Sequence, residues 1–205
     1  MFYIFPQVVP KSECRKLLKY CIKNTKFKDA NVVQKGKSDD GSISINDDGT
    51  YITGGRNDPS IRKTDVAFLT TDREEDNQVN HLVWHYLQEA NKINFNYNLE
   101  FFQPIQFARY RNGGHYGWHQ DSSGASASGE ARKLSLTFSL SDPKTYEGGY
   151  LEFFLSKPMH ESWVKDIKAQ GSIVVFDSRD YHRVTPVTKG TRYSIVCWTT
   201  GPNFI

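Results

Sequence analysis

The second half of the chain most constrains the fold, because short segments of alternating apolar and polar residues are separated there by turns. Side chains on a β-strand repeat every two residues, so this alternation predicts strands. The predicted strands are residues 101–110, 132–140, 149–155, 172–177, 183–187 and 191–200, and Thr188 to Gly190 is predicted to be a turn. Such a run of short strands is typical of an all-β sandwich or barrel.

The first 98 residues predict two helices among shorter elements. Residues 2–9 predict a strand, and Ser12 is expected to be the N-cap of a following helix. Residues 61–69 predict another strand, and residues 74–93 carry apolar side chains at helical spacing. We therefore expect one domain over residues 1–205, with helical support in its first half and a β-core in its second.

Residues 29–60 are polar and rich in glycine. Within them, Ser42 to Ile45 and Thr50 to Thr53 could form a hairpin that turns at Asn46 to Gly49. A long irregular segment in a compact domain is often a lid or a binding loop. We therefore expect residues 29–60 to be a mobile loop of this kind.

A pair of potential metal ligands stands at the end of a short stretch that begins at Tyr110. His119 and Asp121 are two residues apart, so on a strand they would point to the same side. One imidazole and one carboxylate are two thirds of the ligand set that suits non-haem Fe(II). This triplet also occurs often by chance. His182 follows a buried strand and a tight turn, where either a ligand or a structural histidine would fit.

Two predicted strands carry polar residues on one face. In residues 134–140 the leucines and Phe138 share one face, and Ser135, Thr137 and Ser139 share the other. In the last strand Arg192, Ser194, Val196 and Trp198 share a face. These faces could be exposed to solvent. If they are buried, the small polar residues leave room for a polar molecule, and Arg192 needs an anionic partner such as a carboxylate.

Composition excludes some classes of protein. The net charge is +3 and no block of Lys and Arg is long enough for a nucleic-acid tail, so no nucleic-acid partner is expected. No apolar run approaches the length of a membrane span, and residues 1–6 do not resemble a signal peptide. Three cysteines are simplest to explain as free thiols. We therefore expect a cytosolic protein without a membrane partner.

The His119-x-Asp121 pair, then His182, then Arg192-x-Ser194 form a specific order when taken together. With this order, the chain resembles the Fe(II)- and 2-oxoglutarate-dependent oxygenases of the prolyl 4-hydroxylase-like branch. The resemblance covers roughly residues 100–202 and is carried by residues 110–121, 132–140, 146–153, 171–178, 182–187 and 190–198.

The resemblance implies a mainly β fold with supporting helices, a double-stranded β-helix (jelly roll) over residues 99–205. It implies that His119, Asp121 and His182 bind Fe(II), and that Arg192 pairs with the distal carboxylate of 2-oxoglutarate. Tyr110 and Trp198 match positions near this co-substrate. The implied enzyme is an oxidoreductase, a dioxygenase that consumes O2 and hydroxylates a prolyl residue in a protein or peptide, with L-ascorbic acid as a candidate reductant.

One position departs from the family pattern. Many family members carry a tyrosine where this chain has Ser139, and that tyrosine holds the 2-oxoglutarate carboxylate. Because Ser139 has a shorter reach, we expect Ser194 or Thr137 to do more of this work with Arg192.

Several alternatives are open or disfavoured. Nucleic-acid repair dioxygenases carry a second arginine where this chain has Trp198. The acidic ligand Asp121 disfavours a halogenase. A small-molecule hydroxylase of the same fold stays open, as does a non-catalytic jelly-roll binding module, although a binding module would not need the ligands, the arginine and the small polar face together.

Overall fold

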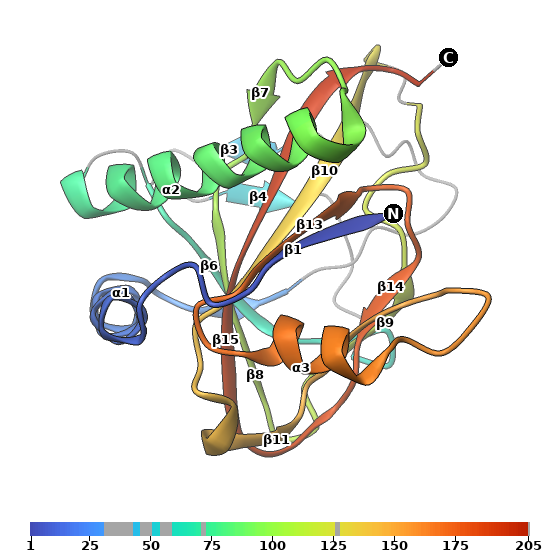
Figure 1. Cartoon of the computed structure of the whole chain (residues 1–205). Coiled ribbons are helices and arrows are strands. Elements are labelled where there is room, and N and C mark those ends of the chain that lie inside the picture. The colour runs from blue at the N-terminus through green and yellow to red at the C-terminus, as the bar shows by residue number, and fades with distance from the viewer. Residues whose placement is uncertain (31–42, 46–50, 54–58, 71–72, 126–127, 205) are drawn as a thin grey trace.

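Two β-sheets face each other, and two long helices cover the outer face of the larger one. This is seen in a computed structural model that describes residues 1–30, 43–45, 51–53, 59–70, 73–125 and 128–204 (Figure 1). The arrangement confirms the expected mainly β fold with supporting helices. Among the described residues, no helix has the length and apolar character needed to span a bilayer.

The larger sheet is antiparallel and runs through both halves of the chain. Its order is β1 (Phe2–Phe5), β13 (Ile173–Asp177), β10 (Glu130–Ser139), β15 (Val187–Pro202), β8 (Gln106–Arg111), β6 (Asp65–Phe68) and β2 (Lys28–Asp29). Two further strands, β7 (Phe101–Phe102) and β11 (Tyr146–Gly148), also pair with β15.

The smaller sheet lies opposite and carries both candidate histidine ligands. Its order is β12 (Leu151–Phe153), β14 (His182–Val184), β9 (His115–His119) and β5 (Arg62–Lys63). Separately, β3 (Ile43–Ile45) pairs with β4 (Tyr51–Thr53), as the predicted hairpin requires. The turn predicted at residues 46–49, and most of the loop 29–60, lie outside the described residues.

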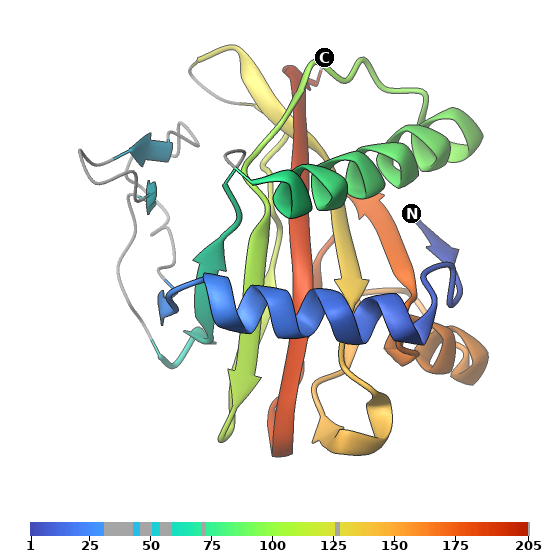
Figure 2. The same ribbon diagram turned by 90° about the vertical axis from the view of Figure 1, so that its left-hand side faces the viewer.

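The helices α1 (Lys11–Asn24) and α2 (Glu74–Ala90) both lie over the same face of the larger sheet (Figure 2). The helix α2 continues into a π-helical turn, Asn91–Phe95, and a 3₁₀ turn covers Pro143–Thr145. A shorter helix, α3 (Glu161–Lys168), precedes β13. The outer core joins buried positions of both long helices to β10, including Cys14, Val83, Leu87, Leu136 and Phe138.

Alternation along the central strands separates this outer core from an inner one. Leu134, Leu136, Phe138 and Leu140 share one face, as predicted, and pack in the same core as the helices, while the residues between them face the smaller sheet. The inner core contains Tyr110, Tyr146, Leu151, Phe153, Phe176 and Val184. Ser135, Thr137 and Ser139 are also buried, so their face of β10 is a polar strip inside the molecule.

The first 98 residues contribute strands as well as helices, and β1 lies within the predicted strand 2–9. The predicted strand 61–69 divides at Thr64, because β5 joins the smaller sheet and β6 joins the larger one. The helix α1 begins after Pro10, whose carbonyl accepts the first helical hydrogen bond from Cys14 at 3.0 Å. Ser12 is therefore inside the first turn and is not the N-cap.

The predicted turn at Thr188 to Gly190 is wrong, since these residues lie within β15 and pair with β11. A Cβ atom on Gly190 would lie 2.1 Å from the carbonyl oxygen of Thr145. Gly190 is therefore needed for a close approach between strands, with no reversal of the chain. The predicted strand 101–110 is likewise interrupted, between β7 and β8.

The three cysteines, Cys14, Cys21 and Cys197, are buried free thiols, which confirms the expectation from their number and spacing. Burial raises the pKa of each thiol, to about 11 for Cys14 and to about 12 for Cys21 and Cys197. They are therefore protonated and behave as small apolar side chains in the core.

Candidate metal and co-substrate site

The candidate ligands His119, Asp121 and His182 converge on one point between the two sheets. Their ligating atoms all lie within 4.8 Å of one another. Nε2 of His119 is 3.5 Å from Oδ1 of Asp121, and Nε2 of His182 is 3.5 Å from its Oδ2. Two imidazole nitrogens and a carboxylate arranged in this way can hold one divalent ion, so the donor set fits Fe(II).

The sheet register brings the two histidines together. His182 on β14 pairs directly with His119 on β9, and their ring centroids are 4.1 Å apart. Asp121 follows two residues after the end of β9, and its backbone N–H donates to the carbonyl of Ser178 at 2.8 Å. The period-two argument therefore holds for the position of the carboxylate, although Asp121 itself lies just beyond the strand.

Each histidine is oriented by a backbone carbonyl. Nδ1 of His119 lies 2.8 Å from the carbonyl oxygen of Gly117, and Nδ1 of His182 lies 2.9 Å from that of Asp180. A carbonyl oxygen can only accept, so the proton of each neutral ring is on Nδ1. This tautomer leaves both Nε2 atoms as lone-pair donors toward the shared point.

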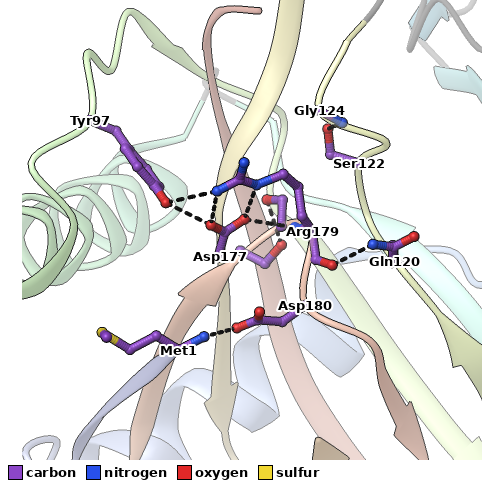
Figure 3. A network of polar contacts seen from close by, with 10 residues as sticks. Met1, Tyr97, Gln120, Ser122, Gly124, Asp177, Arg179 and Asp180 are labelled. Carbon is purple, nitrogen blue, oxygen red and sulfur yellow. Dashed lines mark hydrogen bonds and ion pairs between the residues drawn. The ribbon is translucent and has the colours of Figure 1, made fainter. Parts of the chain in front are cut away.

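The turn that carries His182 is held by a network of polar contacts (Figure 3). Nη2 of Arg179 donates to Asp177 at 2.6 Å, and the hydroxyl of Tyr97 donates to the same carboxylate at 2.6 Å. The backbone N–H of Arg179 also donates to Asp177, at 2.8 Å. The N-terminal amine of Met1 pairs with Asp180 on the same turn. This network fixes the backbone from which His182 projects.

Asp121 is held by a hydroxyl pair that the sequence did not reveal. The hydroxyl of Ser135 donates to Oδ2 of Asp121 at 2.7 Å, and its oxygen lies 2.9 Å from the hydroxyl oxygen of Ser178. Ser135 and Ser178 are fully buried. The alternation of β10 placed Ser135 on the inner face, and this was the available signal for its role.

Electrostatics favour an ionised Asp121 beside a neutral His182. Burial by itself opposes ionisation of Asp121, but His182, His119 and Arg132 together outweigh it and hold the pKa of Asp121 well below its usual range. Burial lowers the pKa of His182 to about 4, although Asp121 opposes that shift. At neutral pH this is the protonation state that a divalent cation requires of its ligands.

An aromatic ring supports His119 from the side. The ring of Tyr116 is stacked on His119, with centroids 3.5 Å apart and planes at 15°. The guanidinium of Arg62 lies 4.5 Å from the centroid of the Tyr116 ring. Tyr116 and Arg62 were not singled out in the sequence, because β5 and β9 are far apart in the chain and meet only in the smaller sheet.

The predicted co-substrate residues lie on β8, β10 and β15, on the inner face of the larger sheet. Arg192 is 3% exposed, and its Nη1 donates to the hydroxyl of Ser194 at 3.0 Å. The guanidinium carbon of Arg192 is 5.2 Å from the centroid of the Tyr110 ring. Arg192 and Ser194 are therefore buried neighbours, and the solvent-exposed alternative for this face is wrong.

The other predicted co-substrate residues have different surroundings. Trp198 is paired with Ser135, and its ring lies 4.3 Å from the guanidinium carbon of Arg132. Thr137 is buried opposite Val196. The hydroxyl of Ser139 donates to the carbonyl of Ile167 at 2.9 Å. Ser139 is thereby engaged with α3, so its hydroxyl hydrogen is committed within the protein.

Comparison with known proteins agrees with this geometry. Residues 105–200 match the 2OG-Fe(II) oxygenase superfamily, where 2OG is 2-oxoglutarate. Over this stretch, just under half of its length, the chain is similar to that superfamily. The match begins before β8 and extends into β15, so it contains the three candidate ligands and Arg192.

Curated relatives cover only part of this chain. A PKHD-type hydroxylase of Shewanella sp. strain ANA-3 is 39% identical over 102 residues, which is 49% of this chain and 43% of that protein. A PKHD-type hydroxylase of Delftia acidovorans is 39% identical over 100 residues, which is 47% of this chain and 42% of that protein. The chain thus spans less than half the length of these relatives.

Solved structures share the fold over nearly the whole chain. A prolyl-4-hydroxylase from Pseudomonas putida has a TM-score of 0.65 at 21% identity, and the match covers 97% of this chain and 91% of that one. A prolyl hydroxylase from Trichoplax adhaerens, solved with a hypoxia inducible factor peptide fragment, has a TM-score of 0.61 at 16% identity, covering 97% and 82%. These similarities confirm the double-stranded β-helix.

Proposed function

We propose that this protein is an Fe(II)- and 2-oxoglutarate-dependent dioxygenase that hydroxylates a prolyl residue in a protein or peptide. The observation that carries the proposal is the convergence of His119, Asp121 and His182 within 4.8 Å, on the inner side of a fold whose superfamily uses this chemistry. The substrate class rests on the PKHD-type hydroxylase relatives and the prolyl hydroxylase folds.

The residues of the chain have separate tasks in this proposal. His119, Asp121 and His182 hold the ferrous ion, which together with 2-oxoglutarate and O2 supplies the oxidising chemistry when bound. Ser135 and the backbone carbonyls of Gly117 and Asp180 keep the ligands in one orientation before the ion arrives. Neither Asp121 nor His182 has to lose a proton at neutral pH, because the pKa of Asp121 is held low and burial lowers the pKa of His182 to about 4.

Arg192 is the proposed anchor for the co-substrate. Its guanidinium is buried, and it can pair with the distal carboxylate of 2-oxoglutarate through charge-assisted hydrogen bonds. Such pairing leaves the 2-oxo acid end of the molecule free to approach the ligand triad. Tyr110 and Trp198 are proposed to line the same space, and Ser194 and Thr137 to add polar contacts.

The experiment that tests the proposal is an anaerobic titration of the protein with Fe(II) and 2-oxoglutarate, followed by the visible charge-transfer band of the ternary complex. The wild type and His81→Ala should give the band, because His81 is exposed on α2 and serves as a matched control. His182→Ala should not give it. Absence of the band in folded wild-type protein would reject the oxygenase and favour a jelly-roll binding module.

The substrate class is tested separately. Proline-containing peptides are incubated with the iron-loaded protein, 2-oxoglutarate and O2, and the products are analysed by tandem mass spectrometry. Gain of one oxygen atom on proline supports the prolyl hydroxylase, whereas turnover of free small molecules alone would favour the small-molecule hydroxylase. A cytosolic location, ascorbate as reductant and the absence of a nucleic-acid partner stay predictions.

A further inference from the structure

A cavity beside β2 and β5, the edge strands of the larger and the smaller sheet, is lined by more cations than carboxylates. Its volume is about 380 Å³. The three candidate metal ligands and Arg192 do not line it, so it is separate from the candidate metal site. The charged side chains that the structure describes in its lining are Arg62, Lys63, Arg109, Arg111, Asp29 and Asp65, which leave a surplus of two positive charges.

Arg62 is a buried cation without an anionic partner. It is 9% exposed, and its buried Nε atom forms no hydrogen bond within the described residues. The ion pairs among these residues do not include Arg62, and its guanidinium carbon lies 4.5 Å from the centroid of the Tyr116 ring. An aromatic face offsets only part of the cost of removing a guanidinium from water. Arg62 therefore needs an anion that the described part of the chain does not supply.

Asp65 orients two further guanidinium groups without neutralising both. Its Oδ2 accepts from Nε of Arg109 at 2.8 Å and from Nε of Arg111 at 3.2 Å. The guanidinium carbon of Arg109 also lies 4.0 Å from the centroid of the Phe27 ring, which holds this side chain in place. One carboxylate is thus shared by two cations. Their terminal Nη groups, which form no other hydrogen bond in the described part of the chain, can donate to a second anion.

Lys63 adds an ammonium group from β5. Its Nζ donates to the backbone carbonyl of Asn112 at 2.6 Å, and this acceptor is neutral. An ammonium has three donors, so two are left for a ligand. Asn112 has φ +50° and Gly113 has φ +77°, so the turn after β8 takes a left-handed conformation at the point where its carbonyl meets Lys63. The cations of the cavity are therefore held from both strands, β5 and β8.

We propose that this cavity binds a phosphomonoester dianion. Such a group carries about two negative charges near neutral pH, which equals the surplus of positive charge in the lining. Guanidinium groups bind its oxygens through paired, charge-assisted hydrogen bonds. A single carboxylate would neutralise only half of the surplus. The dianion can belong to a free metabolite or to a phosphorylated side chain of a polypeptide, and the site itself does not depend on the metal chemistry.

The test is a calorimetric titration of the protein with phenyl phosphate at about 150 mM salt, which screens weak long-range attraction. One molecule should bind per chain. Phenyl sulfate has nearly the same shape but a single negative charge, so it should bind at least roughly tenfold more weakly. Lys63→Met and Arg62→Lys should each weaken phenyl phosphate binding by about tenfold, because the first removes a cation and the second removes the paired donors of a guanidinium.

Lys28→Met is the matched control variant. Lys28 is exposed on β2 next to Asp29 but does not line the cavity, so its loss should leave phenyl phosphate binding unchanged. Circular dichroism and thermal melting confirm that each variant is folded. Lys63 is exposed, so Lys63→Met decides the test if Arg62→Lys does not fold. Weakening by Lys28→Met equal to that by Lys63→Met would refute the proposal, because the attraction would then be unspecific.

A second titration separates this cavity from the co-substrate site. Excess 2-oxoglutarate should leave the dissociation constant of phenyl phosphate unchanged. Competition between the two would place the phosphate beside Arg192 and refute the proposal. Equal affinity for phenyl phosphate and phenyl sulfate would also refute it, because the cavity would not select a dianion.

Peptides distinguish the two sources of the dianion. A peptide with one phosphorylated serine is compared with phenyl phosphate and with the same peptide without phosphate. Binding of the phosphorylated peptide at least roughly tenfold more tightly than phenyl phosphate, and weakened by Lys63→Met, would assign the dianion to a polypeptide. Equal or weaker binding would assign it to a free phosphomonoester. If folded wild-type protein binds neither phenyl phosphate nor the phosphorylated peptide, the proposal is refuted, and the proposed function is unaffected.

Discussion

Replacing Ser135 with alanine tests how far the protein orients its ligands before the metal binds. Ser135 is fully buried, and its hydroxyl donates to Oδ2 of Asp121 at 2.7 Å. The change Ser135→Ala removes this donor and leaves a methyl group in nearly the same volume. Packing around β10 should therefore change little, and the effect should fall on the carboxylate.

The size of the expected loss of metal affinity follows from the negative charge of the acceptor, Asp121. A hydrogen bond to an ionised group contributes about 1.5–3 kcal/mol, and each 1.4 kcal/mol is about tenfold in a binding constant. The same bond also stabilises Asp121 before metal binds, so part of the effect cancels. We expect metal affinity to fall by about tenfold, the lower end of the range of roughly 10- to 100-fold for residues that support metal ligands.

The assay is an anaerobic calorimetric titration with Fe(II), repeated with Co(II). Ser139→Ala is the matched control, because Ser139 is buried on the same face of the same strand but bonds to Ile167. It should keep the metal affinity of the wild type. Ser135→Thr keeps the hydroxyl and should retain most of the affinity. If Ser135→Ala binds metal as tightly as Ser139→Ala, the argument that Ser135 orients Asp121 is refuted.

Two predictions concern the stability of the scaffold. Burial opposes ionisation of Asp177, but its bonds from Arg179 and Tyr97 outweigh burial and lower the pKa of Asp177, with Lys133 as a further nearby cation. A depressed pKa contributes stability that is present above about pH 4 and is lost as the pH falls. Asp177→Asn should therefore lower the melting temperature at pH 7 and make it fall less on acidification. Equal acid sensitivity of both proteins in melting curves would contradict this. Gly171→Ala should destabilise by more than about 2 kcal/mol, because Gly171 has φ +91° and a Cβ would lie 2.1 Å from the carbonyl oxygen of Val9. Gly129 has φ +83° and no atom near a new Cβ, so Gly129→Ala should lower the free energy of unfolding by less, through backbone strain alone. Urea denaturation measures both variants, and equal decreases would show that the contact with Val9 is unimportant.

The spacing of apolar residues along the sequence predicted most of the long strands and helices. Alternation predicted the central strands β10, β13 and β15, and helical spacing predicted α2, because a strand or helix with one buried face repeats its apolar residues at the period of its geometry. The order of His119, Asp121, His182 and Arg192 led to the family resemblance, and the resemblance implied their roles. The structure places the first three of these within reach of one ion.

The predictions that failed depended on contacts between distant segments. The segment Thr188 to Gly190 has the composition of a turn, but pairing with β11 holds it in β15. The short helix α3 was not predicted, although Val164 and Ile167 are three residues apart and Ile167 is buried. A helix of this length gives a weak periodic signal, since it completes little more than two turns.

The sequence by itself determined the strand-rich fold class, through periods of two and 3.6 residues, and its resemblance to the Fe(II)- and 2-oxoglutarate-dependent oxygenases identified the candidate metal ligands. Only the tertiary structure decided what surrounds them. It brought the hydroxyl of Ser135 to Asp121 and that of Ser139 to the carbonyl of Ile167, and it packed Arg192 and Tyr146 against Gly149. These contacts join residues that are far apart in the chain, so no local pattern records them, and they exist only once the strands have paired in register.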